Sequence, residues 1–400
     1  MTEPTTTPES STTPAGVTGP RGFRAAGIAA GIKASGRADL ALVVNDGPRF
    51  DAAGVVTRNK VKAAPVLWTQ QVLTTGALRA VVLNSGGANA CTGPEGFQTA
   101  HATAERVGEV LGCGAVEVAV CSTGLIGAQL PRETVLAGVD KVAAELTGAP
   151  EGGGGVAAAI MTTDVVPKQA GVTDPTGWSI GGTTKGAGMI APSMATMLTV
   201  LTTDAALEQP RLDAALRAAV RLSFDRLDID GSMSTNDTVL LLSSGASGVE
   251  AEPAAFTAAL TALCQDLAAQ MQADAEGVTK RITVRVTGAA TEDDAVTVAR
   301  TVARDALVKT AMFGSDPNWG RVAAAAGYAH AAVEPETLDV TINGVLLCRG
   351  AVVAGDRDDC DLSGKEVLVE VGLGLGEGTA EIRTTDLSHA YVEENSAYSS

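Results

Sequence analysis

The chain has 400 residues, 45% of them hydrophobic and 19% charged, which is typical of a globular protein with a large core. Its formal net charge of −17 offers no basic surface for nucleic acid or for a membrane, so we expect neither partner. Six cysteines without a CxxC pair, together with three histidines, argue against a disulfide framework and a Cys/His metal site, and favour a reduced, cytoplasmic setting.

The first half of the chain alternates between strand-like and helix-like segments. Residues 1–20 are rich in Thr, Pro and Ser and lack the apolar stretch of a signal peptide, so we expect a disordered tail there. No apolar run reaches the ~18 residues that a membrane span needs. Val-rich runs predict strands at 40–46, 53–58, 79–86 and 116–122; helices are expected at 95–111 and 131–146, and a loop that feeds a short helix at 149–159.

The second half repeats the alternation. Helices are expected at 210–226, 253–275 and 291–309, and strands at 236–244, 281–288, 338–344 and 366–376. The last strand alternates with period two, as a half-buried antiparallel strand does. Strands and helices are mixed throughout without a solenoid repeat, which predicts an α/β or α+β layered fold.

The common nucleotide and hydrolase motifs are absent. The segment GGTTKGAG (181–188) does not match GxxxxGK[ST], and GLGLGEG (372–378) does not match GxGxxG. There is no GxSxG, and His101, His330 and His389 lie in no hydrolase-like context, His101 falling within a helical pattern. A phosphate loop and a Ser–His nucleophile are therefore poorly supported.

The stretch GAGMIAPSMATMLTV (186–200) offers a different chemistry. It is apolar enough for a buried strand, yet it contains Pro192 and a hydroxyl, Thr196. A Thr can act as a nucleophile when its own free α-amine, with a pKa of about 7.7–8.0, serves as the base. That requires a cut between Ala195 and Thr196, a sterically open bond. Local features alone favour a Thr in a half-buried strand, and the hydrophobic pattern cannot separate the two interpretations.

Several segments, in order, resemble the ornithine acetyltransferase family, the glutamate N-acetyltransferases of arginine biosynthesis. They are GFRAAGIAAGIK (22–33), NSGGANACTG (84–93), CSTGLIG (121–127), MTTD (161–164), KGAGMIAPSMATML (185–198), STNDT (234–238), DAEGVTK (274–280), GSDPNWGR (314–321) and YVEENSAYSS (391–400). The resemblance implies a fold similar to the N-terminal-nucleophile hydrolases, with β-sheets layered between helices. It also implies self-cleavage before Thr196 into fragments 21–195 and 196–400 that form one intertwined body.

Two positions depart from the family pattern. Many members have Asn where this chain has Gly87, and the last residue is often Thr where this chain has Ser400. Both keep a small size or a hydroxyl, so the assignment stands.

The resemblance also implies a role for each matching residue. Thr196 is the expected nucleophile, and Thr123 and Gly124 the donors of the oxyanion hole, for which a hydroxyl and a glycine N–H are suited. Lys185 suits a substrate carboxylate, and Glu276 the cationic amine of ornithine. The full set of expected substrate-binding residues is Thr162, Lys185, Thr196, Glu276, Asn395 and Ser400.

Each of these residues also has a structural interpretation. Without the resemblance, Ser-Thr-Gly at 122–124 is typical of a turn, Thr162 of a helix cap, and Lys185 and Glu276 of solvated side chains. The resemblance further predicts that the C-terminus is ordered by its role in binding, although chain ends usually fray.

The expected reaction is acetyl transfer from N2-acetylornithine to glutamate through an acyl-enzyme on Thr196. The resemblance implies no metal and no cofactor, and an assembly of two copies of each fragment. It leaves open whether acetyl-CoA also serves as donor, and whether the chain is a paralogue of secondary metabolism. A self-processing aminopeptidase would share the cut but use water as acceptor. A non-enzymatic binding protein would leave Thr196 in the core and the chain uncut.

Overall fold

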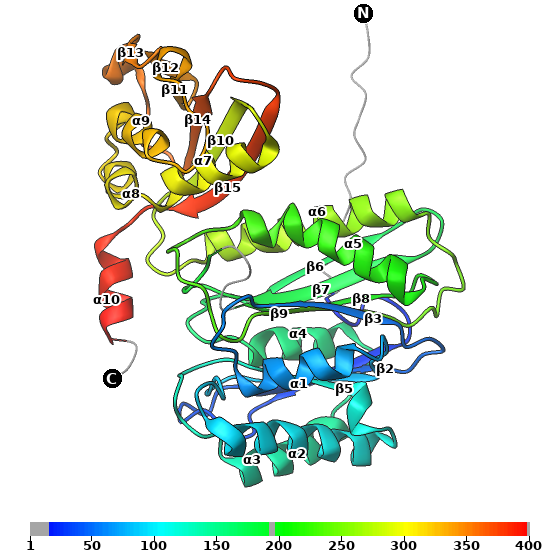
Figure 1. Ribbon diagram of the computed structural model, residues 1–400. Helices are drawn as coiled ribbons and strands as arrows, with labels where there is room; N and C mark the ends of the chain where they lie inside the picture. Colours follow the sequence, from blue (N-terminus) through cyan, green and yellow to red (C-terminus); the bar gives the residue numbers. More distant parts are fainter. Residues whose placement is uncertain (1–15, 192–196, 398–400) are drawn as a thin grey trace, which may run out of the picture.

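The computed structural model describes residues 16–191 and 197–397. Two sheets packed face to face form the larger body, and a third sheet forms a lobe at one end of the molecule (Figure 1). The layered α/β architecture expected from the sequence is therefore confirmed. None of the helices within the described ranges is long and apolar enough to cross a membrane.

The first sheet has the order β1-β2-β4-β5. Helices α2 and α3 pack on its outer face, while α1 and α4 each contact an edge strand of both sheets and so close the two sides of the body (Figure 1). These elements are β1 (Phe23–Ile28), β2 (Leu40–Asn45), β4 (Ala80–Asn84), β5 (Val118–Ser122), α1 (Ala64–Leu73), α2 (Gly93–Leu111), α3 (Arg132–Ala144) and α4 (Pro150–Ala159).

The second sheet joins strands from both sides of the predicted cut. Its order is β3-β9-β8-β7-β6, with α5 and α6 on the outer face. Strand β8 pairs with β7 in antiparallel and with β9 in parallel orientation, so both predicted fragments contribute neighbouring strands. The elements are β3 (Ala52–Val56), β6 (Lys168–Thr173), β7 (Ser179–Lys185), β8 (Leu198–Thr203), β9 (Thr238–Ser243), α5 (Gln209–Arg221) and α6 (Pro253–Ala273).

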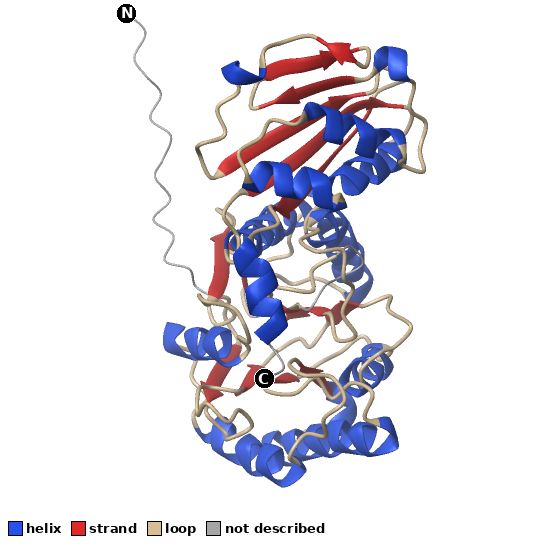
Figure 2. Cartoon of the chain, turned by 90° about the vertical axis from the view of Figure 1, so that its left-hand side faces the viewer, coloured by secondary structure: helices blue, strands red, loops and turns tan. Residues whose placement is uncertain are grey.

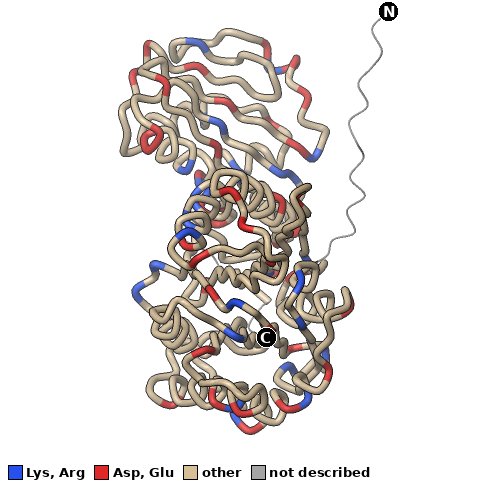
Figure 3. The backbone as a smooth tube through the Cα atoms, turned by 90° about the vertical axis from the view of Figure 1, so that its right-hand side faces the viewer, with Lys and Arg blue, Asp and Glu red and all other residues tan. Residues whose placement is uncertain are grey.

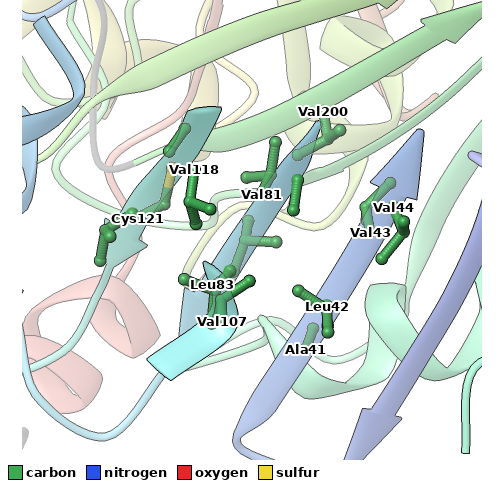
Figure 4. Close-up of a cluster of buried hydrophobic side chains, with 14 of the residues drawn as sticks. Ala41, Leu42, Val43, Val44, Val81, Leu83, Val107, Val118, Cys121 and Val200 are labelled. Atoms are coloured by element: carbon green, nitrogen blue, oxygen red, sulfur yellow. The ribbon is translucent and has the colours of Figure 1, made fainter. Parts of the chain in front are cut away.

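The core between the two sheets is built from small aliphatic side chains. Val200 and Leu240 of the second sheet share one buried cluster with Val43 and Val81 of the first (Figure 4). Alternate residues such as Leu201 point the other way, into the cluster beneath α5 and α6. The central strands β8 and β9 are therefore buried on both faces, as strands between two covered faces must be.

The third sheet has its own core and carries the C-terminal helix back toward the body. Its strand order is β13-β12-β11-β14-β10-β15, packed against α7, α8 and α9. Helix α10 leaves this lobe and lies beside the layered body (Figure 2). The elements are β10 (Arg281–Ala289), α7 (Glu292–Arg304), α8 (Ala306–Phe313), α9 (Trp319–Gly327), β11 (Asp339–Ile342), β12 (Val345–Arg349), β13 (Val352–Val353), β14 (Glu366–Gly372), β15 (Gly378–Thr385) and α10 (His389–Ala397).

Two segments, one expected to be a single helix and one expected to be a loop before a short helix, differ from the structure. The stretch 291–309 is two helices, because Asp305 is extended and its carboxylate accepts the Val308 N–H at 2.8 Å, starting α8 anew. The stretch 149–159 is helical from Pro150 onward despite its glycines. A Cβ at Gly152 would lie 2.4 Å from the Ala25 carbonyl oxygen, so a glycine there allows α4 to pack closely against β1.

The tail and the 186–200 stretch also differ from expectation. The described chain begins at Gly16, and Val17 is fully buried within the stretch expected to be a tail. Residues 186–191 form no strand: β7 ends at Lys185 and β8 begins at Leu198. The N–H groups of Met189 and Ile190 bind the carboxylate of Asp230 instead of a neighbouring strand.

Replacing Leu240 with Ala should lower the free energy of unfolding by about 2–5 kcal/mol, because the side chain is fully buried between the sheets and leaves a cavity. Urea denaturation measures the loss. The control is Val353→Ala, at a residue 66% exposed in the third lobe, which should stay within about 0.5 kcal/mol of the parent. Equal losses in the two variants would contradict the described core.

Candidate active site

One cavity collects the described residues that the sequence predicts for the site. Its volume is about 350 Å³, and Thr123, Gly124, Thr162, Lys185, Glu276 and Asn395 all line it. Ala195, Thr196 and Ser400, the other predicted site residues, lie outside the described residues. The cavity wall nevertheless includes Gly188 and Met189 upstream of the predicted cut, and Ser234, Thr235 and Asn236 from the loop before β9.

Thr123 and Gly124 follow β5 directly and face a second turn after β4. The Gly87 N–H donates to the Thr123 carbonyl at 3.0 Å. Gly124 has a φ of +132°, and a Cβ there would lie 2.5 Å from the Gly87 nitrogen. Only glycine therefore permits this close approach of the two turns.

Side-chain amides and a hydroxyl hold these turns in place. The Ser122 hydroxyl donates to Asn84 Oδ1 at 2.5 Å, and Asn84 Nδ2 donates to the Gly87 carbonyl at 3.1 Å. Asn236 Nδ2 donates to the carbonyls of Ala88 and Ser122 at 2.6 and 2.8 Å. The carbonyls of Gly87, Ala88 and Ser122 thus accept hydrogen bonds from the amides of Asn84 and Asn236. The Gly124 N–H makes no hydrogen bond to a described residue.

Gly87, where the family pattern often has Asn, lies in the same contact. A Cβ at this position would lie 2.7 Å from Leu130 Cδ2, so a larger residue would require the Leu130 side chain to move. The glycine thus fits the packing of the Leu130 side chain in this protein.

Lys185 is the last residue of β7 and is buried, not solvated. Its Nζ lies 3.4 Å from Thr123 Oγ1 and 3.9 Å from Asp164 Oδ2. Burial lowers the pKa of Lys185, while the Asp164 carboxylate acts in the opposite direction. In the β7–β8 ladder Lys185 faces Leu198, two residues beyond Thr196 in the sequence.

Asp164 is the buried counter-ion of this region. Its carboxylate accepts hydrogen bonds from Lys168 Nζ and the Gly186 N–H, both at 2.7 Å, and from the Thr162 N–H at 3.1 Å. Burial alone would raise its pKa, but the charges of Lys185 and Lys168 and these hydrogen bonds outweigh burial and lower the pKa below its ordinary value. Most other ion pairs lie at the surface, where positively and negatively charged residues are interspersed (Figure 3).

The cavity wall also carries an acidic side chain, Glu276. Glu276 follows α6, and its Oε2 accepts a hydrogen bond from Asn395 Nδ2 of α10 at 2.8 Å. A Cβ at Gly188 would lie 2.1 Å from Glu276 Oε2. The Glu276 carboxylate can therefore occupy this position because residue 188 has no side chain. The expectation that the C-terminal segment is ordered holds for residues 389–397, which form α10.

The three histidines and the cysteines lie apart from this chemistry. His101 stacks on Trp68 with ring centroids 4.8 Å apart, and His389 packs edge-on against Phe313. All six cysteines are free thiols. Across residues 16–191 and 197–397, no group of three or more His, Cys, Asp or Glu side chains could hold a metal ion.

The cavity wall offers a cation, Lys185, an anion, Glu276, and hydrogen-bond donors at Thr123 and Gly124. An amino acid with a carboxylate and a cationic side chain matches the two charged groups. The Thr123 hydroxyl and the Gly124 N–H lie beside Lys185, where they could bind an oxyanion. The site is therefore suited to acyl transfer involving a small amino acid.

Sequence reasoning missed several residues that build the site. Asp164 is the last residue of the MTTD segment, and Asn236 and Asp237 lie within STNDT. In these two segments, the sequence analysis predicts a site role for Thr162 alone. No local sequence signal marks these side chains, because their burial follows from packing between segments that are far apart in the chain.

Comparison with known proteins gives a consistent result. The model of the ArgJ family matches residues 24–400. The arginine biosynthesis bifunctional protein ArgJ of Mycolicibacterium paratuberculosis is 64% identical over 390 residues, covering 96% of each chain, and the same holds for the ArgJ protein of Mycobacterium tuberculosis. A solved structure of ornithine acetyltransferase complexed with ornithine, from Mycobacterium tuberculosis, is 65% identical and covers 45% of this chain and 96% of its own, with a TM-score of 0.45.

Asp164→Asn should lower the free energy of unfolding near pH 7 by about 3–5 kcal/mol, because it removes the buried negative charge that faces two ammonium groups. The lowered pKa of Asp164 means that its stabilisation is present above about pH 4, where the unfolded carboxyl is ionised, and is lost as the pH falls further. Urea denaturation at several pH values measures the difference.

The matched control for this prediction is Asp46→Asn, which breaks an exposed ion pair with Arg24. Its cost should be about 0–1 kcal/mol, because water screens the exposed pair. A cost for Asp164→Asn no larger than for the control would contradict the electrostatic role of Asp164.

Proposed function

The chain belongs to the ArgJ family, the bifunctional acetyltransferases of arginine biosynthesis, and we propose that its cavity transfers the acetyl group of N2-acetylornithine to glutamate. The products are ornithine and N-acetylglutamate. The observation that carries this proposal is the convergence of the six described candidate residues on one cavity, beside the strand that begins at Leu198. The reaction so proposed needs neither a metal nor a cofactor.

The nucleophile is the hydroxyl of Thr196, exposed by self-cleavage after Ala195. The new α-amine of Thr196 is the base that removes the hydroxyl proton, which a neutral amine can do near pH 7. Protonation of that amine below about pH 7–8 would remove the base and slow the reaction.

Acylation requires stabilisation of a tetrahedral oxyanion. The Thr123 hydroxyl and the Gly124 N–H supply its hydrogen bonds, and the Asn236 and Asn84 amides keep the two turns from shifting as charge develops. Loss of one such donor typically costs about 10²–10³ in rate. Preorganisation of this kind lowers the barrier because no reorientation is needed during the reaction.

Substrate binding uses two charged side chains of the cavity wall. Lys185 binds the α-carboxylate that donor and acceptor share, and Glu276 binds the cationic amine of ornithine. Glutamate carries a side-chain carboxylate where ornithine carries this amine. A neutral hydrogen-bond donor, such as the Thr162 hydroxyl, binds that carboxylate. The amine of glutamate then attacks the acetyl ester and returns the free Thr196 hydroxyl.

The assembly follows from the same family membership. We propose that two copies of each fragment associate, with the fragments held together by the shared β7–β8–β9 sheet. The use of acetyl-CoA as a second donor for glutamate stays a prediction.

Self-cleavage is tested by Thr196→Ala. The purified parent protein should show two fragments by intact mass, the second beginning with Thr196, whereas the variant should remain a single inactive chain because it lacks the attacking hydroxyl. Thr163→Ala, at another threonine of the cavity wall, is the control and should be cut as the parent is. A parent chain that is uncut, or cut elsewhere, would reject the proposed nucleophile.

The kinetic pattern tests the covalent intermediate. Initial rates at varied acetylornithine and several fixed glutamate concentrations should give parallel double-reciprocal lines, because ornithine leaves before glutamate reacts. Lines that intersect would exclude this order of events. Hydrolysis of amino-terminal peptides without transfer to glutamate would instead identify an aminopeptidase.

A further inference from the structure

Helix α10 brings Asn395 to the cavity although it buries no residue of its own. All of its residues are exposed except Tyr391, which is half-buried. His389, in the first turn, packs against Phe313 of the third lobe, which leaves the rest of the helix beside the layered body (Figure 2). The turn that carries Asn395 is therefore held mainly by hydrogen bonds.

The Tyr391 hydroxyl ties this helix to the cavity wall. It donates to Asp230 Oδ2 at 3.3 Å, and the same oxygen accepts the Met189 N–H at 2.7 Å. Asp230 Oδ1 accepts the Ile190 N–H at 3.0 Å. Met189 has a φ of +54°, a left-handed conformation that residues other than glycine rarely adopt, so Asp230 holds a strained turn in place. One carboxylate thus joins α10 to the segment that carries Gly188.

The charges around Tyr391 keep its hydroxyl a donor. Burial raises the pKa of Tyr391, and the negative charges of Asp230 and Glu276 act in the same direction, so the phenol stays protonated near neutral pH. Burial also raises the pKa of Asp230, and the charge of Glu276 adds to this rise while the N–H groups bound to Asp230 oppose it. Glu276 is therefore close enough to act on both members of the pair.

The backbone of Tyr391 orients the side chain that reaches Glu276. Tyr391 and Asn395 are four residues apart and lie on one face of the helix. Asn395 Nδ2 donates to the Tyr391 carbonyl at 3.0 Å and to Glu276 Oε2 at 2.8 Å, which uses both of its hydrogens. The backbone of Gly188 packs on the same carboxylate oxygen. The position of Glu276 thus depends on where Tyr391 holds α10.

We propose that Tyr391 is a positioning residue that sets the preference for a donor with a cationic side chain: its hydroxyl anchors α10 on Asp230, so that Asn395 fixes the Glu276 carboxylate. The proposal rests on the proposed function, in which Glu276 binds the side-chain amine of ornithine. Tyr391 is not one of the described residues that line the cavity, so it acts through Asn395. A carboxylate already held in place binds a cation more tightly, because less ordering is needed on binding.

A pair of donors isolates the contribution of the amine. N2-acetylornithine and N2-acetylnorvaline share one carbon chain and differ only in the side-chain amine. The ratio of their kcat/KM values, with glutamate as acceptor, therefore measures how well the site recognises that group. Tyr391→Phe removes one hydrogen bond and keeps the ring, so it should lower this ratio about 3–10-fold. The kcat/KM for N2-acetylnorvaline should stay at the parent value.

The matched control is Tyr328→Phe. Tyr328 also donates to an aspartate, Asp305 Oδ2 at 2.9 Å, but it lies in the third lobe and does not line the cavity. This variant should keep the parent ratio. A ratio lowered equally by both variants would contradict a specific role for Tyr391.

A double variant tests whether Tyr391 acts through Asn395. In an Asn395→Ala background, Tyr391→Phe should cause little further loss of the ratio, because the amide that Tyr391 orients is already gone. An equal loss in the two backgrounds would contradict the proposed route.

A parent ratio in Tyr391→Phe, or an equal fall in kcat/KM for both donors, would overturn the proposal. Should Tyr391→Phe fail to fold by circular dichroism, Asp230→Asn decides, because it weakens the same hydrogen bond from the acceptor side. A folded Asp230→Asn with a lowered ratio supports the proposal, and one with the parent ratio rejects it. A parent enzyme that does not transfer acetyl from N2-acetylornithine, or does not prefer it to N2-acetylnorvaline, would instead reject the proposed function, so the two failures are distinguishable.

Discussion

A single buried negative charge organises the site. Asp164 binds the N–H groups of Thr162 and Gly186 and faces the ammonium groups of Lys168 and Lys185. A buried ammonium group is strongly unfavourable without a nearby anion, so Asp164 is what allows Lys185 to lie inside the cavity wall. The same carboxylate fixes the backbone at Gly186, where β7 ends and the segment leading to Thr196 begins. The buried charge of Lys185 and the course of the backbone at Gly186 thus both depend on the Asp164 carboxylate.

The second constraint is the close approach of two turns. Gly124 contacts Gly87 at a distance that no side chain tolerates. The Asn84 and Asn236 amides donate to the local backbone carbonyls, and the Ser122 hydroxyl donates to Asn84 Oδ1. This leaves the Gly124 N–H available for a substrate oxygen. Asn236 comes from the fragment after the proposed cut and the turns from the fragment before it, so the proposed oxyanion hole needs both fragments in one body.

The sequence predicted much of the fold because its strands are Val-rich and bounded by turn residues, as at β2, β4 and β5. The prediction was wrong where carboxylates, and not a neighbouring strand, accept the backbone hydrogen bonds. The sequence pattern of residues 186–191 predicts a strand, but the N–H groups of Gly186, Met189 and Ile190 donate to Asp164 and Asp230. The predicted site residues came from family resemblance, since local pattern favoured a turn at Gly124 and a solvated Lys185. No local pattern distinguishes a buried carboxylate such as Asp164 or Asp237 from an exposed one; the difference lies in long-range packing.

The central claim is that an acetyl group rests on Thr196 between the two half-reactions. Intact mass of the two fragments after brief incubation with N2-acetylornithine alone tests it most directly. The fragment beginning with Thr196 should gain one acetyl group and lose it when glutamate is added. No acetyl gain, gain on the other fragment, or an acetyl group that glutamate cannot remove would contradict it.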